Sequence, residues 1–308
     1  MRNIVTGGAG FIGSHIAEYL VKQGEEVIII DDLSGGTTDN FQGWWNYRLC
    51  TFVKADISDF HMMQSVFEDV DCVFHDACSK CVVCEKDPHR DLEVNAWGTR
   101  NVIEASLKWG VKKIVHASTG SVNNYNPKSF YGVSKTAAEG YYKAYSAMYP
   151  ELNYTILRYH HVFGERQSDV GVVPTFIKRA LAEKPLTIYG GYQKRRFTYV
   201  GDVVRANMIA RDLPSSQILP VLSDTNRTIE DLSLDIAFLS PKSVTFEYQD
   251  HKPNEIMEFP VDNSEMKALG LVYSDYGESL ENTLRWYERQ NNCKCPCGDC
   301  DGICEFIG

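Results

Sequence analysis

The first half of the chain alternates short apolar runs with stretches of helical period. The apolar runs are typical of strands buried on both faces, and they recur at residues 4–5, 27–30, 51–54, 72–75, 113–117 and 154–158. Helical spacing of apolar residues is clearest over 14–23, 60–67, 92–109 and 131–149. Alternation of this kind predicts an α/β fold, a Rossmann-type doubly wound parallel sheet with helices on both faces.

After about residue 160 the pattern becomes irregular. Helices are predicted over 173–183, 203–210 and 280–290, with mixed short elements between them. We therefore predict a Rossmann domain over 1–160, to which segments near 190–210 return, and a smaller discontinuous C-terminal substrate lobe over 161–290. Residues 291–308 form a Cys-rich tail.

A glycine motif joins the first strand to the first helix. It reads Thr-Gly-Gly-Ala-Gly-Phe-Ile-Gly from Thr6 to Gly13. Gly7, Gly10 and Gly13 suit a tight turn, a close backbone approach to a pyrophosphate, and close packing of helix on strand. The free N–H groups at the start of the helix favour phosphate binding. The motif predicts a bound dinucleotide.

Two carboxylates end the second strand. Asp31 and Asp32 follow the run Glu26–Ile30, where a carboxylate can bond the ribose hydroxyls of adenosine. The same charge would repel a 2′-phosphate, so the sequence favours NAD(H) over NADP(H).

Composition and charge restrict the class of protein. The 308 residues are 44% hydrophobic, which is enough for a real core, and the net charge of −10 comes without a basic run. These features argue against a nucleic-acid partner. No apolar run reaches membrane-spanning length, and the first strand begins at the N-terminus without a secretory signal. We expect a soluble cytoplasmic protein with no membrane association.

Ten cysteines fall mainly into two groups. The first follows the strand that ends at His75, in a predicted loop, and consists of Cys78, Cys81 and Cys84. Its thiols suit either a metal or a reduced loop of small apolar side chains, and the second interpretation is preferred. The tail group consists of Cys293, Cys295, Cys297, Cys300 and Cys304. These five thiols either surround one metal ion, such as Zn in a tetrahedral site, or an iron–sulfur cluster, or stay reduced.

Candidate chemistry is carried by Tyr131-Gly-Val-Ser-Lys135. The spacing places a phenol and an ammonium on one helical face. A tyrosine is a poor base at neutral pH, but a neighbouring cation stabilises its phenolate. Thr119 follows the strand that runs to Ser118, and its hydroxyl can reach the same substrate oxygen. These three residues are therefore the predicted catalytic set.

The sequence resembles the extended short-chain dehydrogenases, the NAD-dependent nucleotide-sugar epimerases and dehydratases, and is similar to those of the UDP-glucose 4-epimerase type. The resemblance covers residues 1 to about 290, and its motifs are those at 6–13, 31–34, 55–57, 94–102, 117–119, 131–135, 157–164 and 195–204.

The resemblance implies roles for particular residues. NAD would be held by Gly7, Gly10, Phe11, Ile12, Gly13, Asp31, Asp32, Ser34, Gly35, Asp56, Ile57, Ala77 and Asn95, together with Tyr131 and Lys135. Tyr131 would be the catalytic acid/base, Lys135 would adjust the pKa of Tyr131, and the Thr119 hydroxyl would contact the same substrate oxygen. The substrate would contact Thr119, His161, Arg195 and Lys252. A homodimer through the helices at 92–109 and 131–149 is also implied.

The residues after Thr119 favour one reaction of this family. Dehydratases carry an Asp-Glu pair there, and decarboxylases often carry a Glu, whereas this chain has Gly120 and Ser121. Epimerisation, most simply at C4 of a UDP-hexose, needs no further acid. A dehydratase, decarboxylase or reductase would need a carboxylate from elsewhere, for which Glu165 and Asp76 are candidates. A non-catalytic NAD-binding sensor with a metal-binding tail is the alternative from another class.

Overall fold

The computed structural model describes residues 1–46, 48–79, 81–124, 129–168, 171–251, 257–258 and 262–292. The chain divides into two compact units, which are described separately. Unit 1 consists of Met1–His160, Val203–Val221 and Ser264–Leu271. Unit 2 consists of the described residues of His161–Asp202, Leu222–Asn263 and Val272–Gly308.

Unit 1 is built on a seven-stranded sheet in which every neighbouring pair is parallel. Its strands are β1 (Arg2–Thr6), β2 (Glu26–Asp31), β3 (Cys50–Lys54), β4 (Cys72–His75), β5 (Lys113–Thr119), β6 (Tyr154–Tyr159) and β11 (Gln217–Val221). The order β11-β6-β5-β4-β1-β2-β3 reverses direction between β1 and β4, where open α/β sheets bind ligands. This topology confirms the predicted Rossmann-type fold.

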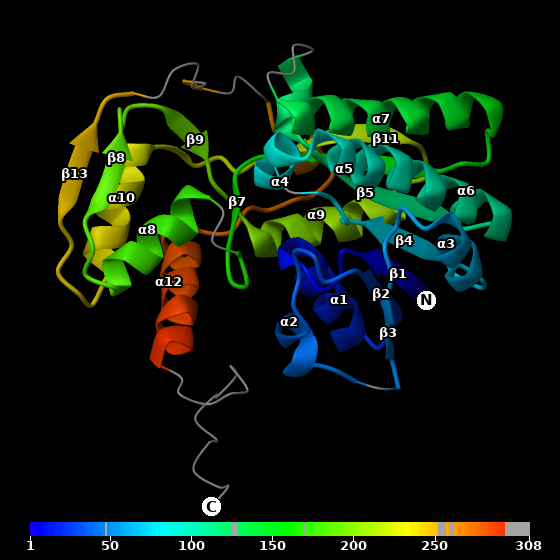
Figure 1. The fold of residues 1–308 in the computed structure, drawn as a ribbon, viewed down its shortest axis with the longest axis horizontal. Helices are drawn as coiled ribbons and strands as arrows, with labels where there is room; N and C mark the ends of the chain where they lie inside the picture. The colour runs from blue at the N-terminus through cyan, green and yellow to red at the C-terminus, as the bar shows by residue number, and fades with distance from the viewer. Residues whose placement is uncertain are drawn as a thin grey trace, which may run out of the picture. The chain divides into compact units, whose positions relative to one another are not determined.

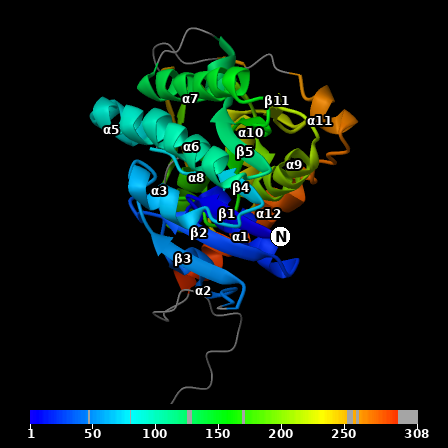
Figure 2. The ribbon, with the colours of Figure 1, turned by 90° about the vertical axis from the view of Figure 1, so that its right-hand side faces the viewer.

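Helices cover both faces of this sheet. They are α1 (Phe11–Lys22), α2 (Asp39–Gln42), α3 (Phe60–Val66), α4 (Cys81–Lys86), α5 (Pro88–Leu92), α6 (Thr99–Trp109), α7 (Phe130–Met148), α9 (Val200–Asp212, in unit 1 from Val203) and α11 (Ser264–Ala268). A π-helical turn, η1 (Glu93–Gly98), precedes α6, and a 3₁₀ turn, η2 (Gly120–Asn124), follows β5. Figures 1 and 2 show α3, α6 and α7 on one face and α1 and α9 on the other.

Local sequence explains where these helices begin and end. Ser129 caps α7 by accepting a hydrogen bond from the Gly132 N–H at 3.1 Å. Asp87 caps α5 in the same way, and Pro88 occupies its first turn. Gly110 ends α6 with a φ of +67°, a left-handed conformation that favours glycine.

One hydrophobic core cluster of unit 1 lies between the sheet and the layer of α3, α6 and α7. Ile4 of β1, Phe67 just after α3, Ile103 of α6 and Tyr142 of α7 belong to it and are fully buried. Burial on this scale makes the strands near-continuous apolar runs, which is why their positions are evident in the sequence.

Unit 2 combines three two-stranded sheets with three helices. The strand pairs are β7 (Val162–Phe163) with β10 (Thr198–Tyr199), β8 (Leu186–Tyr189) with β13 (Phe246–Gln249), and β9 (Lys194–Arg196) with β12 (Asn226–Thr228). The helices are α8 (Val172–Leu181), α10 (Ile229–Leu239) and α12 (Tyr276–Asn292). Phe176, Leu232 and Leu284 form part of a buried cluster to which all three helices contribute.

Across the described ranges, no helix combines the length and the apolar character needed to cross a membrane.

Candidate active site

The glycine turn after β1 packs backbone against backbone. Gly7 has a φ of +68°, and its N–H donates to the Ile30 carbonyl at 2.7 Å. A Cβ on Gly7 would lie 2.7 Å from the Ala77 nitrogen, and one on Gly13 would lie 2.3 Å from the Gly7 oxygen. Neither position therefore admits a side chain. A turn with backbone packed this closely lets the phosphates of a dinucleotide approach the main chain.

The start of α1 is suited to an anion. Gly10 is its N-cap residue and offers no side-chain cap, and the first turn carries no acidic residue. Phe11 and Ile12, the first two residues of the helix, are half-buried. The N–H groups of this turn keep the partial positive charge of the helix N-terminus for a phosphate.

Asp31 connects β2 to the glycine turn. Its carboxylate accepts hydrogen bonds from the Ala9 N–H at 3.0 Å and the Leu33 N–H at 2.8 Å. Asp32 accepts from the N–H and the hydroxyl of Ser34, at 2.9 and 2.6 Å, and Gly35 follows in the same exposed bend. The structure thus brings the predicted ribose-binding segment against the predicted phosphate-binding turn.

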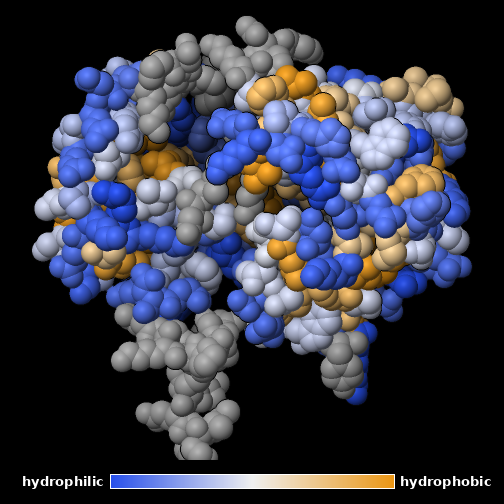
Figure 3. Space-filling view, viewed as in Figure 1, coloured by the Kyte–Doolittle hydropathy of each residue, from blue (hydrophilic) through white to orange (hydrophobic). Residues whose placement is uncertain are grey.

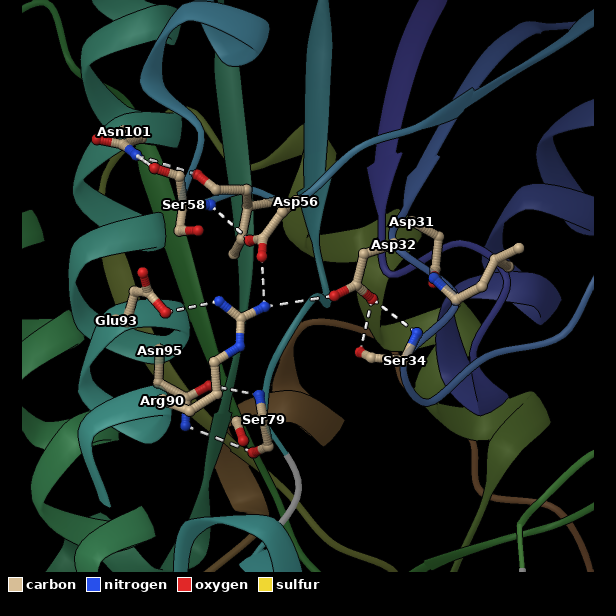
Figure 4. Close-up of polar contacts among 12 residues, drawn as sticks. Asp31, Asp32, Ser34, Asp56, Ser58, Ser79, Arg90, Glu93, Asn95 and Asn101 are labelled. Atoms are coloured by element: carbon tan, nitrogen blue, oxygen red, sulfur yellow. Dashed lines mark hydrogen bonds and ion pairs between the residues drawn. The ribbon is translucent and has the colours of Figure 1, made fainter. Parts of the chain in front are cut away.

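Arg90 bridges the predicted ribose and adenine residues (Figure 4). Its guanidinium donates to the Asp56 carboxylate, lies 3.4 Å from that of Asp32, and pairs with Glu93 at 2.7 Å. Burial would raise the pKa of Asp56, but hydrogen bonds from Ser58 and Arg90 outweigh it and lower that pKa. Sequence reasoning did not find Arg90, although the Asp-Pro pair just before it marks the start of a helix.

Ile57, beside Asp56, is 3% exposed. A Cβ on Gly98 would meet its side chain at 2.7 Å, so η1 approaches the predicted adenine segment closely.

Asp91 joins several elements of unit 1. Its Oδ1 accepts hydrogen bonds from Cys84 Sγ at 2.9 Å, Asn95 Nδ2 at 2.7 Å and Ser134 Oγ at 2.7 Å. Asn95 in turn accepts from the Ser79 N–H at 2.8 Å. Asn95 and Asp91 therefore connect η1 and α5 to Ser134 of α7 through this network. Asp91 and Ser134 were not predicted, although Asp91 and Asn95 have helical i,i+4 spacing.

The predicted loop of thiols is partly helical. Cys78 is exposed, whereas Cys84 lies on α4 with its thiol buried against Asp91. The prediction of a loop through Cys84 was therefore wrong, because the carboxylate of Asp91 orders this turn.

The three predicted catalytic residues lie at the carboxyl end of β5 and the start of α7. Thr119 is the last residue of β5, and its hydroxyl lies 3.4 Å from that of Ser121. Lys135 is 1% exposed and donates to the Ala117 carbonyl at 2.9 Å, which ties α7 to the end of β5. Its Nζ lies 5.9 Å from the ring centre of Tyr131.

Two buried histidines lie near this ammonium. The His75 ring contacts the Thr6 hydroxyl at 2.7 Å and the Thr99 hydroxyl at 3.0 Å. Burial lowers the pKa of His75 to about 3, with a further contribution from Lys135, and both effects also lower the pKa of His116. Both rings are therefore neutral at physiological pH, and the positive charge of this region is concentrated on Lys135.

The remaining predicted residues belong to unit 2 or lie outside the described residues. Arg195, on β9 of unit 2, is 9% exposed and donates to the Lys194 carbonyl at 2.8 Å. His161 begins unit 2 and contacts the Phe197 ring edge-to-face, while Glu165 accepts a hydrogen bond from the Tyr199 hydroxyl. Lys252 and the five tail cysteines lie outside the described residues, so their roles stay predictions. Within the described part of the chain, no three His, Cys, Asp or Glu side chains gather as a metal site would require.

Solved structures resemble this chain along nearly its whole length. The UDP-glucose 4-epimerase of Thermotoga maritima, solved with UDP-glucose, is 31% identical over 94% of this chain and 99% of its own, with a TM-score of 0.86. The UDP-glucose 4-epimerase of Thermus thermophilus, solved with NAD, is 30% identical over 92% and 98%, with a TM-score of 0.83.

The relatives of this chain also include enzymes that are named for other reactions. A UDP-N-acetyl-alpha-D-glucosaminuronate decarboxylase of Bacillus cytotoxicus is 31% identical over 94% of this chain and 99% of its own. The model of the NAD dependent epimerase/dehydratase family matches residues 3–218, which contain the glycine turn, the Thr119–Tyr131–Lys135 set and the parallel sheet except for the first residue of β1 and most of β11. The chain therefore belongs to the NAD-dependent epimerase/dehydratase family.

Proposed function

We propose that this protein is a nucleotide-sugar epimerase that inverts C4 of a UDP-hexose with NAD bound to unit 1. The choice within the family rests on one observation. β5 ends at Thr119, and η2 continues with Gly120 and Ser121, neither of which can donate or accept a proton at neutral pH. Without a carboxylate at these two positions, a reaction that needs a single acid/base suits the end of β5 better than one that needs a carboxylate there.

Different residues of unit 1 have different roles in the reaction. Bound NAD would supply reversible hydride transfer at C4. The Tyr131 phenolate takes the proton of the C4 hydroxyl and returns it after the keto sugar has turned over. The buried Lys135 ammonium compensates the phenolate charge, and the Thr119 hydroxyl donates a hydrogen bond to the same sugar oxygen.

Binding roles follow the predicted assignment. The glycine turn, Phe11 and Ile12 hold the phosphates, and Asp31, Asp32, Ser34 and Gly35 hold the ribose end. The adenine end belongs to Asp56 and Ile57, and Ala77 and Asn95 support the cofactor toward the catalytic set. Arg195, His161 and Lys252 bind the nucleotide sugar, since an arginine fork can meet two phosphate oxygens at once.

Proton NMR in deuterated water tests this function. The protein is incubated with UDP-, dTDP- and GDP-hexoses. A new anomeric signal from the 4-epimer, without deuterium on carbon, is the expected result. Deuterium at C5 or a 4-keto-6-deoxy product would make the protein a dehydratase, and release of carbon dioxide from a UDP-hexuronic acid would make it a decarboxylase. Bound NAD without turnover of any sugar would favour the sensor.

Replacing Tyr131 tests the mechanism. Tyr131→Phe removes the proton-transfer group but keeps the ring, so we expect at least a ~100-fold loss of kcat with unchanged NAD affinity. Calorimetric titration with NAD provides the control for folding. Wild-type turnover in this variant would show that another group carries the proton.

A further inference from the structure

Asp76 is a buried carboxyl group in the wall of the glycine turn. It follows β4 directly, and its N–H donates to the Thr6 carbonyl at 3.2 Å. The adjoining Ala77 nitrogen is the atom that a Cβ on Gly7 would meet. Both carboxyl oxygens of Asp76 are buried, and neither has a hydrogen-bond partner among the described residues. A buried polar group without a partner is uncommon in folded proteins, and a functional role is one of its explanations.

Charged and titratable groups approach Asp76 from two neighbouring elements. His75, the residue before Asp76, lies opposite His116 in the β4–β5 register, and the Lys135 ammonium of α7 donates to the carbonyl of the next β5 residue, Ala117. Tyr159, at the end of β6, lies opposite Thr119 of β5. The Tyr159 hydroxyl accepts a hydrogen bond from Asn207 of α9 at 2.8 Å. His75 and His116, on β4 and β5, are neutral. Lys135 is therefore the cation that acts on the Asp76 carboxyl group.

We propose that Asp76 is a charge-setting residue of the site: its buried and unpartnered carboxyl group, beside the glycine turn and the end of β5 that Lys135 contacts, controls both the stability of the Tyr131 phenolate and the preference for NAD⁺ over NADH. This inference rests on the proposed function, because it gives Asp76 a role through the Lys135–Tyr131 pair. No covalent step is involved. Asp76 is a positioning residue in the electrostatic sense and does not touch the reacting atoms.

The protonation state of Asp76 changes near neutral pH. Burial raises the pKa of Asp76 to about 7, although the Lys135 ammonium lowers it. Above that pH the carboxylate offsets Lys135, destabilises the phenolate, and favours the oxidised cofactor, which carries one more positive charge than the reduced form. Below that pH the neutral acid leaves the full effect of Lys135. A unit charge within a poorly solvated site changes such equilibria roughly tenfold.

Cofactor binding across pH tests the proposal without any sugar. The affinities of apoprotein for NAD⁺ and NADH are measured between pH 6 and 8.5 by calorimetry and NADH fluorescence. In the wild type, the preference for NAD⁺ over NADH should rise about tenfold over this interval. In Asp76→Asn it should stay constant, and tyrosinate absorbance assigned to Tyr131 by comparison with Tyr131→Phe should appear at lower pH.

Asp71 provides a matched control at the opposite end of β4, where it accepts hydrogen bonds from the Arg2 N–H and the Lys112 ammonium. Asp71→Asn removes the same charge and should keep the wild-type pH dependence. If Asp76→Asn does not fold, Asp76→Leu is measured in its place. A preference that does not vary with pH in the wild type, or wild-type behaviour in the Asp76 variant, would overturn the proposal. An absence of sugar turnover alone would overturn only the proposed epimerase function.

Discussion

At the scale of single residues, the site combines one buried cation with neutral neighbours. The His75 and His116 rings lie 4.9 Å apart, and both are fully buried. Protonation of either ring would place a second positive charge near Lys135 in a region with little water. The fold therefore keeps both imidazoles neutral, and the hydrogen bonds of His75 to Thr6 and Thr99 serve packing instead of proton transfer.

This arrangement predicts a loss of stability in mild acid. The pKa of His75 is lowered to about 3 from 6.5, so below pH 6.5 the unfolded chain binds a proton that the folded protein excludes. The contribution of His75 to the free energy of unfolding should therefore fall as pH drops from 6.5 toward 4. His75→Gln should reduce this slope in urea unfolding measured at several pH values. An unchanged slope would show that His75 is charged in the folded protein.

Residue types and spacing indicated a candidate catalytic set, whose roles stay predictions, but not the contacts around it. Tyr131 and Lys135 could be identified because a helix places i and i+4 on one face. Arg90 could not be linked to Asp56 and Asp32, because that bridge depends on how α5 approaches β3 across more than thirty residues of sequence. Polar contacts between residues that are far apart in the chain leave no periodic pattern in the amino-acid sequence.

At the scale of elements, the first six strands of the parallel sheet were predicted within two residues of their observed ends, whereas β11 was not predicted. β4 spans Cys72–His75 as predicted, whereas β5 continues to Thr119. The predicted helix over 92–109 is instead divided, because a π turn interrupts it before Thr99. The Thr99 hydroxyl donates to the Asn95 carbonyl at 2.7 Å, and Asn95 also donates to Asp91. Apolar periodicity does not encode such side-chain competition for the backbone.

We expect alanine substitutions at two glycines, one within a helix and one just after a helix, to change the stability of the protein in opposite directions. Gly140 lies within α7, and an added Cβ would meet no atom within 4 Å, so Gly140→Ala should stabilise the protein by about 0.5–1 kcal/mol. Gly110 is equally unobstructed but has a φ of +67°. Gly110→Ala should destabilise by about 1 kcal/mol. Urea unfolding of the two variants checks the signs, and equal effects would contradict a conformational cause.

At the scale of the whole molecule, sequence pattern described unit 1 better than unit 2. The sheet of unit 1 has long buried runs, but β7 and β10 of unit 2 contain only two residues each. Strands this short carry no detectable alternation, and their partners are distant in sequence. The residues of the pair β9 and β12 could not be matched without the fold.

Exposed aromatic and apolar side chains on η1 and α7 agree with the proposed homodimer. Trp97 is 48% exposed, Phe130 52% and Val133 45%. Hydrophobic side chains are scattered among hydrophilic ones over the α6 and α7 side of unit 1 (Figure 3). This mixed composition is typical of an interface with a polar rim.

Trp97→Asp tests this dimer. A charge in place of an aromatic anchor should weaken association at least ~10-fold, seen as a monomer in sedimentation velocity at micromolar concentration. Phe238, 89% exposed on α10 of unit 2, provides the control. Phe238→Asp should sediment like the wild type. Equal effects of both variants would exclude η1 from the interface.

The π turn Glu93–Gly98 holds one residue more than the α-helical turn that it replaces. Loss of one residue here would leave a continuous helix, in which everything before the turn is rotated by about 100° relative to Thr99. Arg90 would then leave Asp56, and Asp91 would leave Ser134. The length of this segment is therefore as strongly constrained as its chemistry. Over evolutionary time, substitutions here can accumulate singly, whereas an insertion or deletion would break the contacts of Arg90 with Asp56 and of Asp91 with Ser134 in one step.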